Sequence, residues 1–182
     1  MSDTTTGEHQ DTAQITKDAG QAQSLPIRVH AQYIKDISFE NPKAPDSLRN
    51  DQSKPQMDID IDMNARHMPD NDISALYEVL LKLSVRADRQ EHTAFIAEIE
   101  YGATVELGEV EQDQHQPLLL IEVPHLIYPF ARQILSQVVQ QGGFPPLYLA
   151  PIDFRALYLQ QFGEDIDQED QQGGKGNNQE TG

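Results

Sequence analysis

Four segments between residues 27 and 101 alternate apolar and polar residues, a pattern that predicts β-strands with one apolar face each. They are residues 27–39, 57–64, 76–87 and 95–101. The first is irregular, because Ile34 falls at a polar position and Lys35 at an apolar one. This irregularity indicates a bulge or an edge strand. Four strands in succession predict an antiparallel meander.

Beyond Gly108 the apolar residues recur with the spacing of a helix. The apolar stripe begins at Ile127 and ends at the pair Gly142 and Gly143, which is typical of a helix C-terminus. Asp153 has the side chain of an N-cap and predicts a second, shorter helix. Strands followed by helices predict an α+β fold, in which a four-stranded antiparallel sheet precedes a long helix and a shorter C-terminal helix. A sheet covered on one face leaves edges exposed, so we expect an oligomer.

The segment from Val123 to Leu159 combines many large apolar residues with five prolines. Proline lacks a donor N–H and fixes φ, so this segment is predicted to form helix, linker and helix rather than one continuous membrane span. No nucleophile or cofactor loop accompanies it. Apolar surface without reactive groups favours a protein that binds a partner over one that converts a substrate.

Composition divides the chain into three parts. Residues 1–25 and 163–182 are rich in polar and acidic residues and are predicted to be disordered tails. Residues 26–162 have the length of one compact domain.

The formal net charge is −17, and the domain is acidic in its own right. Such a surface repels nucleic acids and anionic lipids, and it favours a cationic protein partner. The chain has no cysteine, so it has no disulfide and no thiolate metal site, which fits a reducing compartment. The N-terminus lacks the pattern of a signal peptide, and no span of about 18 apolar residues is recognised. We therefore expect a soluble, cytoplasmic protein that does not insert into membranes.

The chain offers little support for catalysis, a cofactor or a metal. Asp58, Asp60 and Asp62 match the opening of a calcium loop, but Met63 and Pro69 stand where that loop needs glycine and glutamate. The six histidines show no metal-ligand spacing. A hydrolase built on Asp58, Asp60 or Glu98 is the enzymatic alternative, and it would turn over a substrate.

Four motifs follow one another along the predicted domain: KDISFE from Lys35, ALYEVLLKLSV from Ala75, TAFIAEIEYG from Thr93 and GGFPPLYLAPIDFRALY from Gly142. In this order they resemble SecB, the bacterial protein-export chaperone family. Together they span the predicted domain and leave out only the two tails. The resemblance implies an ATP-independent chaperone, a homotetramer built as a dimer of dimers, which holds precursor proteins unfolded and delivers them to the SecA motor.

The resemblance also implies three sets of site residues. Asp36, Glu40, Ile96 and Glu98 match positions that contact the basic, zinc-bearing C-terminal segment of SecA. Met57, Ile59, Ile61, Tyr158 and Phe162 match positions of client-binding grooves, although alternating Met and Ile on a strand are equally well explained as core. Ala97, Ile99 and Tyr101 match positions at the interface between dimers, and they too could belong to the monomer core.

Two features depart from the resemblance. Gln52 and Ser53 stand in a loop where the family often has an aromatic residue, so client contact there has no support. The N-terminal tail has no counterpart and receives no role. A relative devoted to one partner, such as the SecB-like chaperones of toxin and antitoxin systems, is the closest alternative, because a shared fold does not fix the client.

Overall fold

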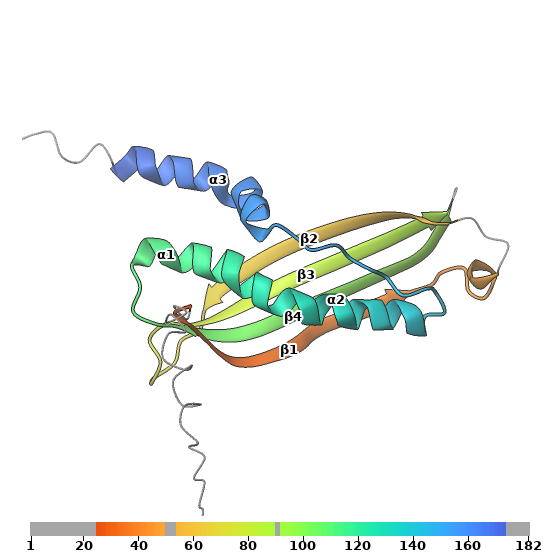
Figure 1. Ribbon diagram of the computed structural model, residues 1–182, viewed down its shortest axis with the longest axis horizontal. Helices are drawn as coiled ribbons and strands as arrows, with labels where there is room; N and C mark the ends of the chain where they lie inside the picture. The colour runs from red at the N-terminus through yellow and green to blue at the C-terminus, as the bar shows by residue number, and fades with distance from the viewer. Residues whose placement is uncertain (1–24, 50–53, 90–91, 174–182) are drawn as a thin grey trace, which may run out of the picture.

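The computed structural model describes residues 25–49, 54–89 and 92–173, with side chains to residue 163 (Figure 1). The predicted disorder of residues 1–24 and 174–182 lies outside these residues. The strands are β1 (Ile27–Glu40), β2 (Gln56–His67), β3 (Leu76–Arg89) and β4 (His92–Leu107). A short 3-10 turn, η1 (Asp46–Leu48), follows β1. The helical elements are α1 (Gln112–Pro117), η2 (Leu118–Glu122), α2 (Val123–Gln141) and α3 (Phe154–Gly173). The predicted α+β architecture is confirmed.

All strand pairs are antiparallel, but the spatial order is β1-β4-β3-β2. The predicted meander is therefore wrong for β1, which lies beside β4 rather than beside β2. The long connection between residues 41 and 55 allows β1 to cross to the opposite edge. This arrangement places the two most buried strands, β3 and β4, at the centre of the sheet, where both of their edges are paired.

Strand β1 contains two bulges, one at His30 and one at Lys35, where the register against β4 shifts. Each bulge inserts one residue and exchanges the faces on which later side chains lie. Residues 31–34 are therefore reversed relative to the rest of the strand. The bulge and the edge position predicted from the irregularity at Ile34 and Lys35 are therefore both confirmed.

One face of the sheet is covered by the helical run from α1 to α2 (Figure 1). The odd-numbered residues of β3 and β4 point to this side and form the core with the helices. Central examples are Leu81, Leu83 and Ile99, which have no exposed surface. The even-numbered residues lie on the opposite face, which we call the open face.

The helix begins at Gln112, well before the predicted start at Ile127. Residues Leu118–Glu122 form one π-helical turn, and Pro124 follows this turn directly without ending the helical run. Pro129 lies inside α2 on its exposed side. The predicted order of helix, linker and helix is confirmed, with Pro145, Pro146 and Pro151 between α2 and α3, whereas Pro124 and Pro129 do not interrupt the helix as expected.

By length and composition, the run Gln112–Gln141 could cross a membrane, which corrects the expectation that the chain has no such span. The apolar stripe extends toward the N-terminus beyond Ile127, through Leu118, Leu119 and Leu120. In this fold the run is the core helix, and Ile127, Ala131 and Leu135 are fully buried against the sheet.

Helix α2 ends before Gly142 and Gly143, as predicted. Gly143 has a φ of +90°, which favours glycine. Helix α3 begins as predicted after Asp153, whose Oδ1 accepts a hydrogen bond of 3.0 Å from the backbone N–H of Ala156. It continues to Gly173, past the domain boundary predicted at residue 162.

Candidate protein-binding surfaces

The open face brings together the residues that the family resemblance assigned to a docking surface. Opposite β4, Asp36 pairs with Glu100, Ser38 with Glu98, and Glu40 with Ile96. Because paired residues share a face, Asp36, Glu40, Ile96 and Glu98 lie on one contiguous surface. Asp36 and Glu40 are exposed, and Ile96 and Glu98 are half-buried.

This surface is more acidic than those four residues suggest. Even-numbered residues of β2 also lie on the open face, since Asp58 pairs with Arg86, Asp60 with Ser84 and Asp62 with Lys82. We call the resulting group of carboxylates the acidic face. Its members are Asp36, Glu40, Asp58, Asp60, Asp62, Glu98 and Glu100.

Two cations on β3 only partly offset the acidic face. Lys82 lies 3.8 Å from Glu98, and Arg86 lies 2.9 Å from Asp88. Glu98 also accepts a hydrogen bond of 2.8 Å from Ser84. The potential over this half of the sheet is therefore negative, which suits a basic partner. Glu100 and the β2 aspartates could be added to the surface only once the register was known.

A second polar group, the Glu78 cluster, lies farther along the open face. The Glu78 carboxylate accepts hydrogen bonds from the Tyr33 hydroxyl and the Arg66 Nε, and Lys35 Nζ lies 3.5 Å away. Glu78 is 5% exposed. The bond from Tyr33 is the largest influence that holds the Glu78 pKa below its ordinary value, and Arg66 and Lys35 act in the same direction. Burial, with the bond to Glu78, raises the pKa of Tyr33 to about 12.

The Glu78 cluster depends on the bulges of β1. Simple alternation places Tyr33 on the helix side, but the bulge at His30 turns it to the open face opposite Gly102. A Cβ at Gly102 would lie 2.7 Å from the Tyr33 ring, so the glycine lets the ring lie flat across the sheet. Sequence reasoning missed this cluster, because only the register reveals which side Tyr33 occupies.

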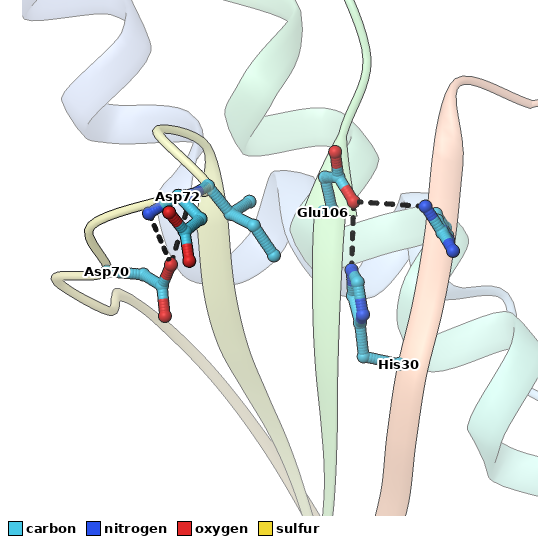
Figure 2. A network of polar contacts seen from close by, with 6 residues as sticks. His30, Asp70, Asp72 and Glu106 are labelled. Carbon is cyan, nitrogen blue, oxygen red and sulfur yellow. Dashed lines mark hydrogen bonds and ion pairs between the residues drawn. The ribbon is translucent and has the colours of Figure 1, made fainter.

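Figure 2 shows the end of the sheet beyond this cluster, where His30 and Glu106 face each other from adjacent strands. His30 Nε2 lies 2.9 Å from Glu106 Oε2. In the turn between β2 and β3, Asp70 Oδ1 accepts backbone hydrogen bonds of 2.9 Å from Asp72 and 3.0 Å from Ile73. These contacts stabilise the end of the sheet, and all of their partners belong to this chain.

The predicted client-binding residues divide into two groups. Met57 and Ile59 on β2 are 44% and 45% exposed, and Ile61 is half-buried. Tyr158 and Phe162 lie on α3 with ring centroids 5.5 Å apart. Tyr158 is buried and donates a hydrogen bond of 3.0 Å to Gln116, whereas Phe162 is half-buried.

Two grooves flank the π-helical turns where α3 packs against them. One, of about 480 Å³, is lined by Leu118, Ile121 and Tyr158 among others. The other, of about 360 Å³, includes Leu119 and Phe162. The structure therefore places Tyr158 and Phe162 at grooves, as the prediction requires, and leaves Met57 and Ile59 on an open strand.

Ala97 and Ile99 have no exposed surface, and Tyr101 retains 7%. All three belong to the core of a single chain. The apolar surface left open above them is on α2, where Leu126 is 42% and Phe130 48% exposed.

Across the described residues, no group of three or more His, Asp or Glu side chains is arranged to hold a metal ion. The β2 aspartates lie on one face of an extended strand, with the alternating apolar residues on the other face, and they do not form a loop around a common centre. The geometry of these residues is that of an exposed strand.

Comparison with known proteins gives one consistent result. Residues 20–165 match the family model for the preprotein translocase subunit SecB. A protein-export protein SecB of Rhodospirillum centenum is 46% identical over 142 residues, which cover 78% of this chain and 82% of that protein. The corresponding protein of Bartonella quintana is 46% identical and is covered to 84%, with 75% of this chain aligned.

A solved structure has the same fold at lower sequence similarity. It is a SecB-like chaperone of Mycobacterium tuberculosis in complex with a peptide from an antitoxin, with a TM-score of 0.57 and 16% identity. The match covers 70% of this chain and 91% of that chain. At this identity the likeness extends to the fold alone.

Proposed function

Because this chain belongs to the SecB protein-export family, we propose that it is an ATP-independent holdase of the cytoplasm, which keeps precursor proteins unfolded and delivers them to SecA. The observation that carries the proposal is the exposure of Met57 and Ile59 on β2, a strand whose later residues Met63 and Ala65 line the groove that includes Phe162. An unfolded chain can contact these exposed apolar side chains without a conformational change driven by a nucleotide. Weak contacts in series would give affinity through multivalency, with broad specificity.

The acidic face is the proposed docking site for the basic, zinc-bearing C-terminal segment of SecA. Asp36, Glu40 and Glu98 supply negative charge, and half-buried Ile96 supplies an apolar contact among them. Opposite charge speeds encounter and sets orientation, and its effect falls with added salt. The docking and client-binding residues lie on opposite faces of the sheet, so both partners can be held at once.

We also infer a homotetramer, a dimer of dimers. A helix row containing Leu126 and Phe130 that is nearly half exposed favours burial against another copy. The contribution to assembly would then be indirect for Ala97, Ile99 and Tyr101, which support α2 from the core of each chain. Exposed Val29 and Ile37 on edge strand β1 add apolar surface that association would cover.

The decisive experiment is refolding of a chemically denatured secretory precursor at low salt, with and without this protein, followed by addition of the SecA C-terminal segment. Stoichiometric retardation without ATP and salt-sensitive binding of the segment are expected. Retardation without segment binding would instead favour a chaperone dedicated to another partner, such as an antitoxin. Absence of both effects would overturn the proposal and favour the alternative of a hydrolase.

A further inference from the structure

Strand β2 is an edge strand, because it pairs only with β3 in the sheet. One hydrogen bond shows which of its backbone groups point away from β3. The backbone N–H of Met68 donates to the carbonyl of Leu76 at 2.8 Å, and the register between the strands runs without a shift from Gln56 to His67. Hydrogen-bonded and non-hydrogen-bonded pairs alternate in an antiparallel ladder. Even-numbered residues of β2 therefore bond to β3, and the N–H and C=O groups of odd-numbered residues point outward.

A side chain from α3 occupies this outward edge. Gln161 Nε2 donates a hydrogen bond of 3.1 Å to the backbone carbonyl of Ile61. A carboxamide has the same donor and acceptor groups as a peptide unit. Gln161 therefore stands where a peptide group of an added strand would stand.

The edge before Ile61 is suited to an extended peptide. Met57 and Ile59 have outward backbone groups, and their side chains are nearly half exposed. Strand addition uses these two features together, because main-chain hydrogen bonds supply affinity and alternate side chains supply contact. The other sheet edge is less regular, since β1 is interrupted by bulges at His30 and Lys35.

A second copy of this chain is a poor occupant of the β2 edge. Antiparallel pairing of two β2 strands about a two-fold axis would place their even-numbered residues on a common face. Asp58, Asp60 and Asp62 would then meet their own counterparts, and like charges across a strand pair are destabilising. Among the described residues, no ion pair neutralises these three carboxylates. The edge therefore favours a foreign segment over self-association.

We propose that Gln161 closes the free edge of β2 at Ile61 and so sets the length of the client segment that pairs with Met57 and Ile59. The inference rests on the proposed holdase function for the identity of the occupant. Gln161 acts as a specificity-determining residue, because release of its side chain from Ile61 lengthens the strip of β2 open to pairing.

The test is amide hydrogen exchange of the full-length protein, followed by NMR, with a short synthetic peptide of alternating valine and threonine. Bound peptide should slow exchange at the Met57 and Ile59 N–H groups, while Asp58 and Asp60, already bonded to β3, provide an internal reference. In the wild type the Ile61 N–H should stay unprotected by the peptide. In Gln161→Ala it should become protected, and the peptide should bind about fivefold tighter, as expected for one or two added hydrogen bonds.

Gln160→Ala is the matched control, because it removes the neighbouring exposed carboxamide of α3 and should behave as the wild type. Peptide binding without added protection at Met57 and Ile59 would overturn strand addition. Equal protection of Ile61 in the wild type and in Gln161→Ala would overturn the role of Gln161. The refolding assay separates the two hypotheses: a protein that retards refolding but fails these exchange tests refutes only this inference, whereas failure to retard refolding refutes the holdase function.

Discussion

At the residue scale, Glu78 is unusual, because no other carboxylate among the described residues is buried. It lies on β3 and bonds to Tyr33 of β1 and Arg66 of β2, so one side chain connects three strands. Removal of a buried, charged hydrogen-bonding group leaves its partners unsatisfied. The Glu78 cluster therefore fixes both edge strands to the centre of the sheet.

We expect Glu78→Gln to lower the free energy of unfolding by about 1 to 3 kcal/mol at pH 7. The Glu78 pKa is lower in the folded protein than its ordinary value of 4.5, so its contribution is complete above pH 4.5 and is lost as the pH falls through the folded pKa. Urea unfolding between pH 7 and pH 3 measures both effects. The variant should lack this part of the acid dependence, and Asp36→Asn, at an exposed acid, should retain it.

Tyr33 gives the opposite dependence on pH. Its folded pKa of about 12 exceeds the ordinary value of 10.0, so the phenol stabilises the fold below pH 10 and this contribution is lost as the pH rises toward 12. Tyr33→Phe should be less stable at pH 8 and should show a flatter stability profile between pH 10 and 12. An unchanged alkaline profile would contradict the burial of this hydroxyl.

Gly142 is constrained by close packing. A Cβ at this position would lie 2.1 Å from the Phe39 ring, which stacks on Phe95 with centroids 5.8 Å apart. Gly142→Ala should therefore destabilise the protein by about 1 to 3 kcal/mol, measured by urea unfolding. Gly163→Ala is the control, because nothing lies within 4 Å of its added Cβ, and alanine there should be neutral or stabilising. Partial recovery of stability in Gly142→Ala with Phe39→Leu would identify the clash as the cause.

At the scale of elements, alternation predicted all four strands but not their order. Nothing in the sequence of residues 41–55 indicates which edge of the sheet β1 joins. The bulge at His30 also leaves no pattern in the sequence from which it could be predicted. The pleat nevertheless placed Asp36, Glu40, Ile96 and Glu98 on one surface, because two bulges in β1 restore the original alternation. Tyr33 and Gly102, which lie across from each other, could not be paired without the register.

The acidic face yields a prediction about docking at this scale. Glu98→Lys should reduce affinity for the SecA C-terminal segment at least tenfold at low salt, because it reverses a charge among several carboxylates. Assembly and client binding should persist, since the open face lies opposite the apolar surfaces. Isothermal titration at two salt concentrations measures the loss. Glu109→Lys, an equal change of charge at an exposed residue outside the sheet, should have a smaller effect.

At the scale of the whole molecule, the exposed row on α2 predicts assembly. Phe130→Glu places a charge on the surface proposed to contact another copy, and burial of an unpaired charge is costly. We expect the variant to fold, because the side chain is nearly half exposed, and to form smaller species in analytical ultracentrifugation. Gln133→Glu, at an exposed polar position of the same helix, should assemble as the wild type. Intact tetramers of Phe130→Glu would remove this row from the interface.

The bulges of β1 also have an evolutionary consequence. His30 and Lys35 have no partner of their own in the register with β4, so either codon could be deleted while every other residue of the strand kept its partner and its face. Strand β2 has no such reserve, because its register against β3 is unbroken. Loss of one codon within β2 would turn all residues on one side of the deletion to the opposite face. Among descendants of this gene, a one-residue deletion should therefore be tolerated better at His30 or Lys35, where it removes the contact with Glu106 or Glu78, than at any position within β2.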